Sequence, residues 1–432
     1  MSFINQFFSK LIAALRRKSV RGFLWVFGSR TLRIFIQAAY FILLTRGLGV
    51  QEYGLFMGIL ALMKLAFPFA SWGGPQLLVK NVSRDRSLLK PYWGNALCLS
   101  LITGSACILL SLLAAHFIFL GRVSLATVFW IALAELFFAR FFDLALKSFM
   151  AIGQLHRNAQ LGVINSLNNL LAALCLVLLF DTPSAFIWSV LYAISRLLLA
   201  AVALGMIWPY IKGTRLNLSI IRKELLEGFY FSIGLSSQTV YNDVDKTMLS
   251  RLATLEATGI YGAAYRLLDI AMTPIMTALV TVYARFFREG TGGIKSTFKF
   301  AKQLLPFAGL YGLLASGCLL IFAPVVPLVL GDEYAASVSA LRWLSPIVFF
   351  KTFQYFAADT LTGAGYQNAR SGLQIGVAIF NVVANLWLIP IYSWKGAIWS
   401  SLMSDALLTI GLWGLVMFFN QTQLNKSSQP AE

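Results

Sequence analysis

Positively charged side chains lie inside long apolar stretches of this 432-residue chain. Arg30 and Arg33 are in the middle of the run from residue 22 to 44, one helical turn apart, so both project from one face of a helix. A cation at bilayer depth costs at least about 2.5–3.5 kcal/mol on insertion scales. Such side chains are therefore expected to face a water-filled cavity or a partner charge. Guanidinium and ammonium groups in a cavity suit a phosphate or pyrophosphate ligand.

Some cations in the apolar runs have an acid close to them in sequence. Arg266 and Asp269 are three residues apart, as are Arg140 and Asp143, so pairing within one helix could neutralise them. Other cations have no such neighbour, and several unpaired cations in one bundle require something negative in the cavity. We predict that an anionic substrate contacts Arg30, Arg33, Lys64, Arg196, Arg266, Arg342 and Lys351.

Three acidic side chains lie at a similar depth: Glu135, Asp243 and Asp269. A buried carboxylate can titrate near neutral pH, so these are candidates for carrying a coupling proton or sodium ion. The alternative is that they only neutralise neighbouring cations, since Asp243 precedes Lys246 by three residues. The sequence leaves both interpretations open.

The composition is that of an all-α, polytopic membrane protein. Hydrophobic residues make up 58% of the chain and charged residues only 12%, a balance that soluble globular domains do not have. The apolar runs are about 20 residues long and lack the alternation of barrel strands. The four cysteines show no metal-ligand spacing, and no phosphate-binding loop is present. We therefore expect a transporter that needs no cofactor or metal, rather than an enzyme.

The apolar runs and basic loops predict the topology. We expect about twelve spans in two six-helix lobes, with Pro68, Gly73 and Pro75 interrupting the second span. Lysines and arginines concentrate in alternate loops, which places both termini in the cytoplasm. The net charge of +18 then reflects contact with anionic lipids, not nucleic acid. The predicted segments are an amphipathic helix (1–21), two lobes (22–209 and 228–419), a cytoplasmic linker between them (210–227) and a cytoplasmic tail (420–432).

The two halves of the chain resemble each other. Residues 43–62 align without a gap on residues 248–267, which matches Gly54 with Gly259. A second alignment matches Gly153 with Gly365. Because each half has six predicted spans, the two copies have the same orientation. A pseudo-two-fold axis along the membrane normal should relate them.

The sequence LGVQEYGL at residues 48–55, the six-plus-six spans and the basic amphipathic N-terminus resemble a known group of exporters. This is the polysaccharide-biosynthesis branch of the multidrug/oligosaccharidyl-lipid/polysaccharide (MOP) superfamily, and most closely its Wzx-type flippases. The resemblance implies a V-shaped bundle with a cationic cavity in the bacterial inner membrane. It also implies flipping of an undecaprenyl-pyrophosphate-linked repeat unit for O-antigen, capsule or exopolysaccharide synthesis. Polymerase and chain-length proteins would be partners, and Arg30, Arg33 and Lys64 would contact the pyrophosphate.

Two other functions remain open from the sequence. A proton- or sodium-coupled multidrug exporter of the same superfamily would also have twelve spans, and there the acids Glu135, Asp243 or Asp269 would control transport. A membrane polymerase is less consistent with the chain, because every predicted outer loop is short.

Overall fold

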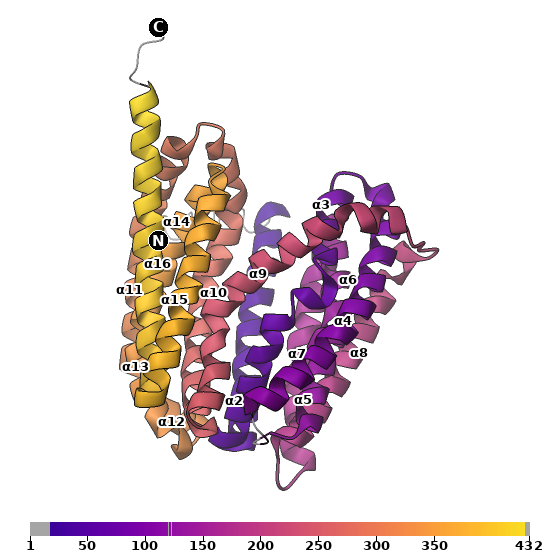
Figure 1. Ribbon diagram of the computed structural model, residues 1–432, viewed down its shortest axis with the longest axis vertical. Helices are drawn as coiled ribbons and strands as arrows, with labels where there is room; N and C mark the ends of the chain where they lie inside the picture. Colours follow the sequence, from indigo (N-terminus) through magenta and orange to yellow (C-terminus); the bar gives the residue numbers. More distant parts are fainter. Residues whose placement is uncertain (1–17, 120, 122, 428–432) are drawn as a thin grey trace, which may run out of the picture.

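The computed structural model describes residues 18–427 except 120 and 122, and this part of the chain consists of helices joined by short loops, without strands. Figure 1 shows two lobes that meet at one end and diverge at the other, in a V. The first lobe contains α2 (Lys18–Ala66), α3 (Gly74–Val82), α4 (Leu89–Phe119), α5 (Leu125–Ala132), α6 (Ala139–Ala151), α7 (Leu155–Leu179) and α8 (Ala185–Ile211). The predicted all-α, two-lobed fold is confirmed.

The second lobe begins with the long helix α9, which also lies against the first lobe (Figure 1). Its helices are α9 (Leu218–Leu252), α10 (Leu255–Gly290), α11 (Ile294–Phe322), α12 (Val325–Leu330), α13 (Ala335–Leu344), α14 (Pro346–Gly363), α15 (Gln367–Tyr392) and α16 (Trp394–Ser427). α9 starts inside the stretch predicted as a linker, and α16 continues into the predicted tail. The predicted amphipathic helix lies outside the described residues, apart from its last four residues, which belong to α2.

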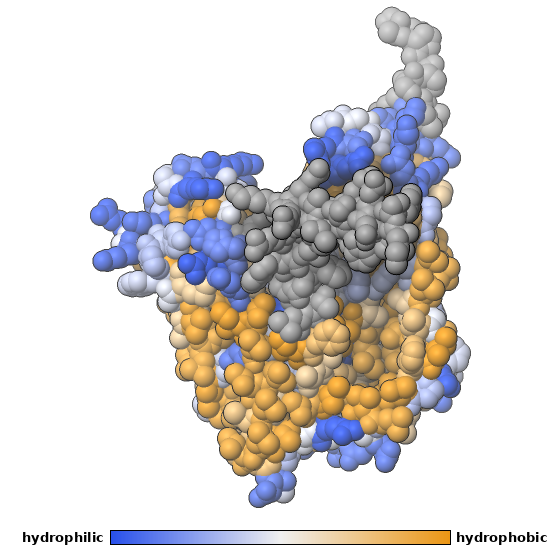
Figure 2. Space-filling view, turned by 180° about the vertical axis from the view of Figure 1, so that it is seen from behind, coloured by the Kyte–Doolittle hydropathy of each residue, from blue (hydrophilic) through white to orange (hydrophobic). Residues whose placement is uncertain are grey.

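The helices form six passes in each lobe. α2 supplies the first pass and the start of the second, which are separated where Gly49 takes a positive φ of 69°. Eight stretches of the described residues are long and apolar enough to cross a membrane. Figure 2 shows a broad apolar band on one face, with hydrophilic residues gathered at both ends. The protein is a multi-pass membrane protein.

The helix break predicted in the second span is confirmed, and α9 stabilises it. Between α2 and α3 the chain forms a short 3-10 turn, Phe69–Ser71, and then passes through two left-handed residues, Trp72 and Gly73. Carbonyl groups freed near such a break need other donors. On α9, the Ser236 hydroxyl donates to the carbonyl of Leu65 at 2.8 Å, and the Ser232 hydroxyl donates to the carbonyl of Pro68 at 2.9 Å.

These two serines provide a stability test. Ser232→Ala and Ser236→Ala should each lower the free energy of unfolding by about 1 kcal/mol, because each leaves a buried carbonyl without its donor. Thermal unfolding of the protein in nanodiscs measures the effect. Ser219, which is exposed on the same helix, is the control, and Ser219→Ala should change nothing. Equal stability of all three variants would contradict this account of the break.

The lobes contact each other through glycines related by the predicted repeat. A Cβ on Gly54 of α2 would lie 1.9 Å from the carbonyl oxygen of Leu255, and one on Gly259 of α10 would lie 2.0 Å from that of Val50. In the repeat alignment, Val50 corresponds to Leu255 and Gly54 to Gly259. The contact is therefore reciprocal, as a two-fold axis between the lobes requires.

The second repeat match is also visible in the backbone. Gly153 follows α6 with φ 79°, and Gly365 follows α14 with φ 88°. In both turns the amide after the glycine donates to a carbonyl five residues earlier: Gln154 to Phe149 at 2.8 Å, and Tyr366 to Leu361 at 2.9 Å. Only a residue that tolerates positive φ can close a helix in this way.

Candidate functional site

Two adjoining cavities form a polar chamber between the lobes. The larger has a volume of about 430 Å³ and is lined mainly by α9, α10 and α14, with Lys64 from α2. The smaller, of about 190 Å³, lies between α2, α8 and α10. Lys64, Asp243 and Asp269 line both cavities. We refer to the two cavities together as the interlobe chamber.

Cations outnumber acids along the walls of the interlobe chamber. The acids are the three predicted coupling candidates, Glu135, Asp243 and Asp269. The cations are Lys64, Arg196, Lys246, Arg266 and Lys351. Four of the seven cations predicted to contact an anionic substrate are thus brought together, from α2, α8, α10 and α14.

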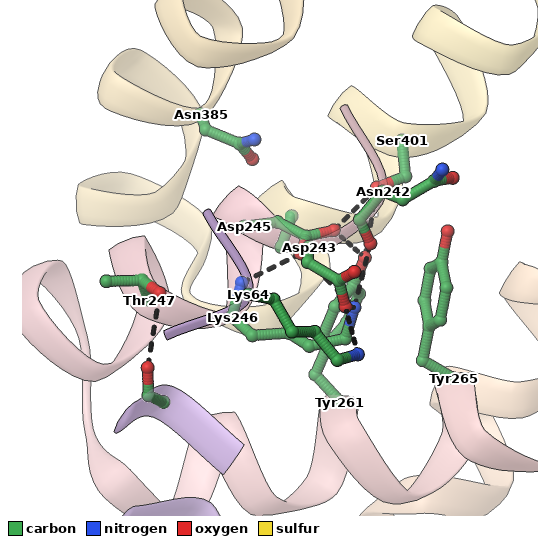
Figure 3. Close-up of polar contacts among 12 residues, drawn as sticks. Lys64, Asn242, Asp243, Asp245, Lys246, Thr247, Tyr261, Tyr265, Asn385 and Ser401 are labelled. Carbon is green, nitrogen blue, oxygen red and sulfur yellow. Dashed lines mark hydrogen bonds and ion pairs between the residues drawn. The ribbon is translucent and has the colours of Figure 1, made fainter. Parts of the chain in front are cut away.

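Asp243 of α9 joins two lysines on the chamber wall (Figure 3). Its carboxylate lies 3.0 Å from the Nζ of Lys64 and 2.9 Å from that of Lys246. Lys246 is also 3.7 Å from Asp245 and donates to the backbone carbonyl of Asn242 at 2.8 Å. Lys64 has no acid near it in sequence, but the expectation that it is unpaired was wrong. α9 supplies the partner from the other half of the chain.

Arg196 of α8 is also paired, by an acid from another helix. Its Nη2 lies 3.5 Å from Glu135 and donates to the hydroxyl of Tyr192 at 2.6 Å. Its Nη1 donates to the side-chain oxygen of Asn165 at 2.8 Å, and Tyr192 donates to Glu135. Glu135 belongs to a π-helical segment, Leu133–Phe138, a type of bulge that often re-aims side chains at functional sites. The expectation that Arg196 is unpaired was therefore also wrong.

Lys351 of α14 is buried and faces neutral donors and acceptors. Its ammonium group donates to the side-chain oxygen of Asn242 at 2.6 Å and to the hydroxyl of Tyr265 at 3.0 Å. Within the described part of the chain, no carboxylate forms an ion pair with it. Lys351 therefore lies beside the larger cavity without an ion-pair partner among the described residues.

Arg266 has no ion-pair partner among the described residues. The i,i+3 pair with Asp269 considered from the sequence does not form: no ion pair joins them among the described residues. Asp269 is exposed to the chamber, where water screens a pair of this kind and leaves little gain from closing it. Arg140 and Asp143, the other such pair, do approach to 3.8 Å.

Two of the predicted substrate contacts that the structure describes, Arg33 and Arg342, do not line the interlobe chamber. Arg33 packs against α7, where a Cβ on Gly162 would lie 2.8 Å from its Nη1. Arg342 is exposed on α13, and the side chain of Arg30 lies outside the described part of the structure. Their roles in binding remain predictions.

Several polar residues of the site were missed by the sequence reasoning. Asn242 and Tyr265 hold Lys351, and Tyr192 connects Arg196 to Glu135. A signal for two of them was present. Tyr192 precedes Arg196 by four residues, which is one helical turn, and Asn242 is adjacent to the candidate acid Asp243.

Solved structures of transporters share this fold. The chain superposes on an inward-facing multidrug resistance MATE family transporter of the MOP superfamily with TM-score 0.72 and 17% identity, over 92% of this chain and 96% of that one. It superposes on the lipid II flippase MurJ, in an inward closed conformation, with TM-score 0.74 and 10% identity, over 91% and 87%. At these identities the likeness establishes the fold alone.

Two sequence comparisons go further than the fold. An uncharacterized membrane protein of Methanocaldococcus jannaschii is 22% identical over 279 residues, which are 61% of this chain and 54% of the relative. This chain thus spans about half the length of that curated relative. Residues 19–288 match the profile of the family described as "Polysaccharide biosynthesis protein". That match covers more than half of the sequence, so the chain belongs to the polysaccharide biosynthesis protein family.

Proposed function

We propose that the protein is a flippase for a lipid-linked oligosaccharide in the cytoplasmic (inner) membrane, with both termini in the cytoplasm. It would move an undecaprenyl-pyrophosphate-linked repeat unit to the outer leaflet for synthesis of O-antigen, capsule or exopolysaccharide. The observation that carries the proposal is an interlobe chamber whose cations outnumber its acids, in a chain of the polysaccharide biosynthesis family. The role is transport rather than catalysis.

The chamber residues suggest how such a cargo is held. Arg266, Lys351 and Lys64 present guanidinium and ammonium donors from two lobes, which fits a pyrophosphate with several acceptor oxygens. Neutral groups such as Asn242 and Tyr355 line the same space and can hydrogen-bond to sugar hydroxyls. The polyprenyl tail would stay in the bilayer. Polymerase and chain-length proteins of the same pathway would take over the flipped unit.

A complementation experiment tests this proposal. Deleting the gene in its host should abolish the surface polymer and leave lipid-linked repeat units accumulating on the cytoplasmic side. The wild-type chain should restore the polymer, and Lys351→Met should not, because a buried methionine keeps the packing and removes the charge. Unchanged surface polymer in the deletion strain, with no accumulated intermediate, would contradict the proposal.

The second candidate is a proton- or sodium-coupled multidrug exporter. It is favoured by the three acids of the chamber, of which Asp269 is exposed to the cavity without an ion pair among the described residues. A cationic drug would prefer such a carboxylate. In that case Asp269→Asn and Glu135→Gln should lower drug resistance of expressing cells, and Lys351→Met should leave it unchanged. The opposite pattern, together with loss of polymer, favours the flippase.

A further inference from the structure

We propose that Asp243 acts as an internal counter-ion that competes with the cargo's pyrophosphate for Lys64 and thereby sets how fast the cargo is released. This inference rests on the proposed function. It assigns Asp243 a role other than carrying a coupling ion.

The geometry gives Asp243 the position of a substrate anion. One of its oxygens, Oδ1, lies 3.0 Å from Lys64 of α2 and 2.9 Å from Lys246 of α9, so a single atom neutralises two ammonium groups (Figure 3). It does so at the wall shared by both cavities. Protonating Asp243 would leave two ammonium groups without this counter-ion at once, which argues against a role as a proton carrier.

The two lysines differ in how strongly they depend on Asp243. The Lys246 side chain is 3% exposed, and it keeps Asp245 at 3.7 Å and the carbonyl of Asn242 at 2.8 Å. The Lys64 side chain is 40% exposed, and Asp243 is its one ion-pair partner among the described residues. A solvated ammonium with one partner can exchange that partner for another anion at little cost. Lys64 is therefore the cation that an arriving pyrophosphate can take.

Exchange of partners makes binding reversible. When the pyrophosphate takes Lys64, Asp243 stays paired with Lys246, so no charge is left without a counter-ion. When the cargo leaves, Asp243 regains Lys64, which offsets part of the attraction that held the cargo. Without the carboxylate, the cargo should bind more tightly and leave more slowly.

The test measures binding of radiolabelled farnesyl pyrophosphate to the full chain in nanodiscs, with farnesol as the blank for tail partitioning. Asp243→Asn keeps the side-chain shape and should tighten binding by about tenfold and slow dissociation. Asp243→Ser should do the same and serves if the amide variant gives little protein. Lys64→Met should weaken binding, and in that background Asp243→Asn should have no further effect.

A second ion pair supplies the matched control. Lys80 of α3 and Glu227 of α9 approach to 2.5 Å outside the interlobe chamber, and Glu227→Gln should leave affinity unchanged. Wild-type binding that Asp243→Asn leaves unchanged or weakens would overturn the counter-ion role and leave the proposed function standing. Absence of binding above the farnesol blank in every variant would overturn both.

Discussion

Replacing Arg266 with alanine should reduce transport of the lipid-linked cargo by about 30-fold or more, with the protein inserted and folded. Arg266 lines the chamber without an ion pair in the described structure, so its charge is available to the pyrophosphate. A hydrogen bond to a charged group contributes about 1.5–3 kcal/mol, and 1.4 kcal/mol is tenfold in affinity. Initial rates of flipping in proteoliposomes measure the effect.

Arg288 supplies the control for this substitution. It is also an arginine of α10, but it is exposed and lines neither cavity. Arg288→Ala should therefore keep the wild-type rate. Equal losses in the two variants would mean that overall positive charge, and not the chamber, controls transport.

Substituting valine for Gly54 should destabilise the junction of the lobes by about 3 kcal/mol or more. A Cβ there would lie 1.9 Å from the carbonyl oxygen of Leu255, and backbone cannot move aside as a side chain can. The reciprocal Gly259→Val should have a similar effect, because its Cβ would meet the carbonyl of Val50 at 2.0 Å. Thermal unfolding in nanodiscs and the yield of monodisperse protein report the loss.

Gly414 on α16 is the matched control for the junction. Nothing lies within 4 Å of a Cβ at this position. Gly414→Ala should leave stability unchanged or raise it slightly, since alanine favours the helix. Wild-type stability of both Gly54→Val and Gly259→Val would show that the lobes do not meet through these glycines.

The sequence indicated where the chamber lies but not how its charges pair. Cations inside apolar runs must face water or a partner, and Lys64, Arg196, Arg266 and Lys351 do line the chamber. The ion-pair partners of these cations, however, could not be predicted from acids three or four residues away on the same helix. The acid that neutralises Lys64 is 179 residues away, and the adjacent acid of Arg266 leaves it unpaired, because the open chamber solvates that carboxylate.

In the fold, too, features set by nearby residues could be predicted from the sequence, and features set by distant contacts could not. Local chemistry predicted the break near Pro68, since proline acts on its own backbone. The repeat alignment matched Gly153 with Gly365, but the helix ends that they form were found only in the structure. The start of α9 at Leu218, inside the predicted linker, depends on contacts with the first lobe that are distant in sequence. Examples are the hydroxyl of Tyr92, which donates to Glu224 at 2.7 Å, and the Trp72 indole, which donates to the carbonyl of Leu225 at 2.9 Å.

Flipping by the purified protein tests the central claim most directly. Proteoliposomes would contain a fluorescent undecaprenyl-pyrophosphate oligosaccharide, and a membrane-impermeant quencher would follow its movement between leaflets. The account predicts rapid translocation by the wild-type chain, loss of it in Lys351→Met, and no translocation of the same oligosaccharide on a lipid without phosphate. Equal rates for the phosphorylated and the phosphate-free lipid, or an undiminished rate in Lys351→Met, would contradict a chamber that selects its cargo by negative charge.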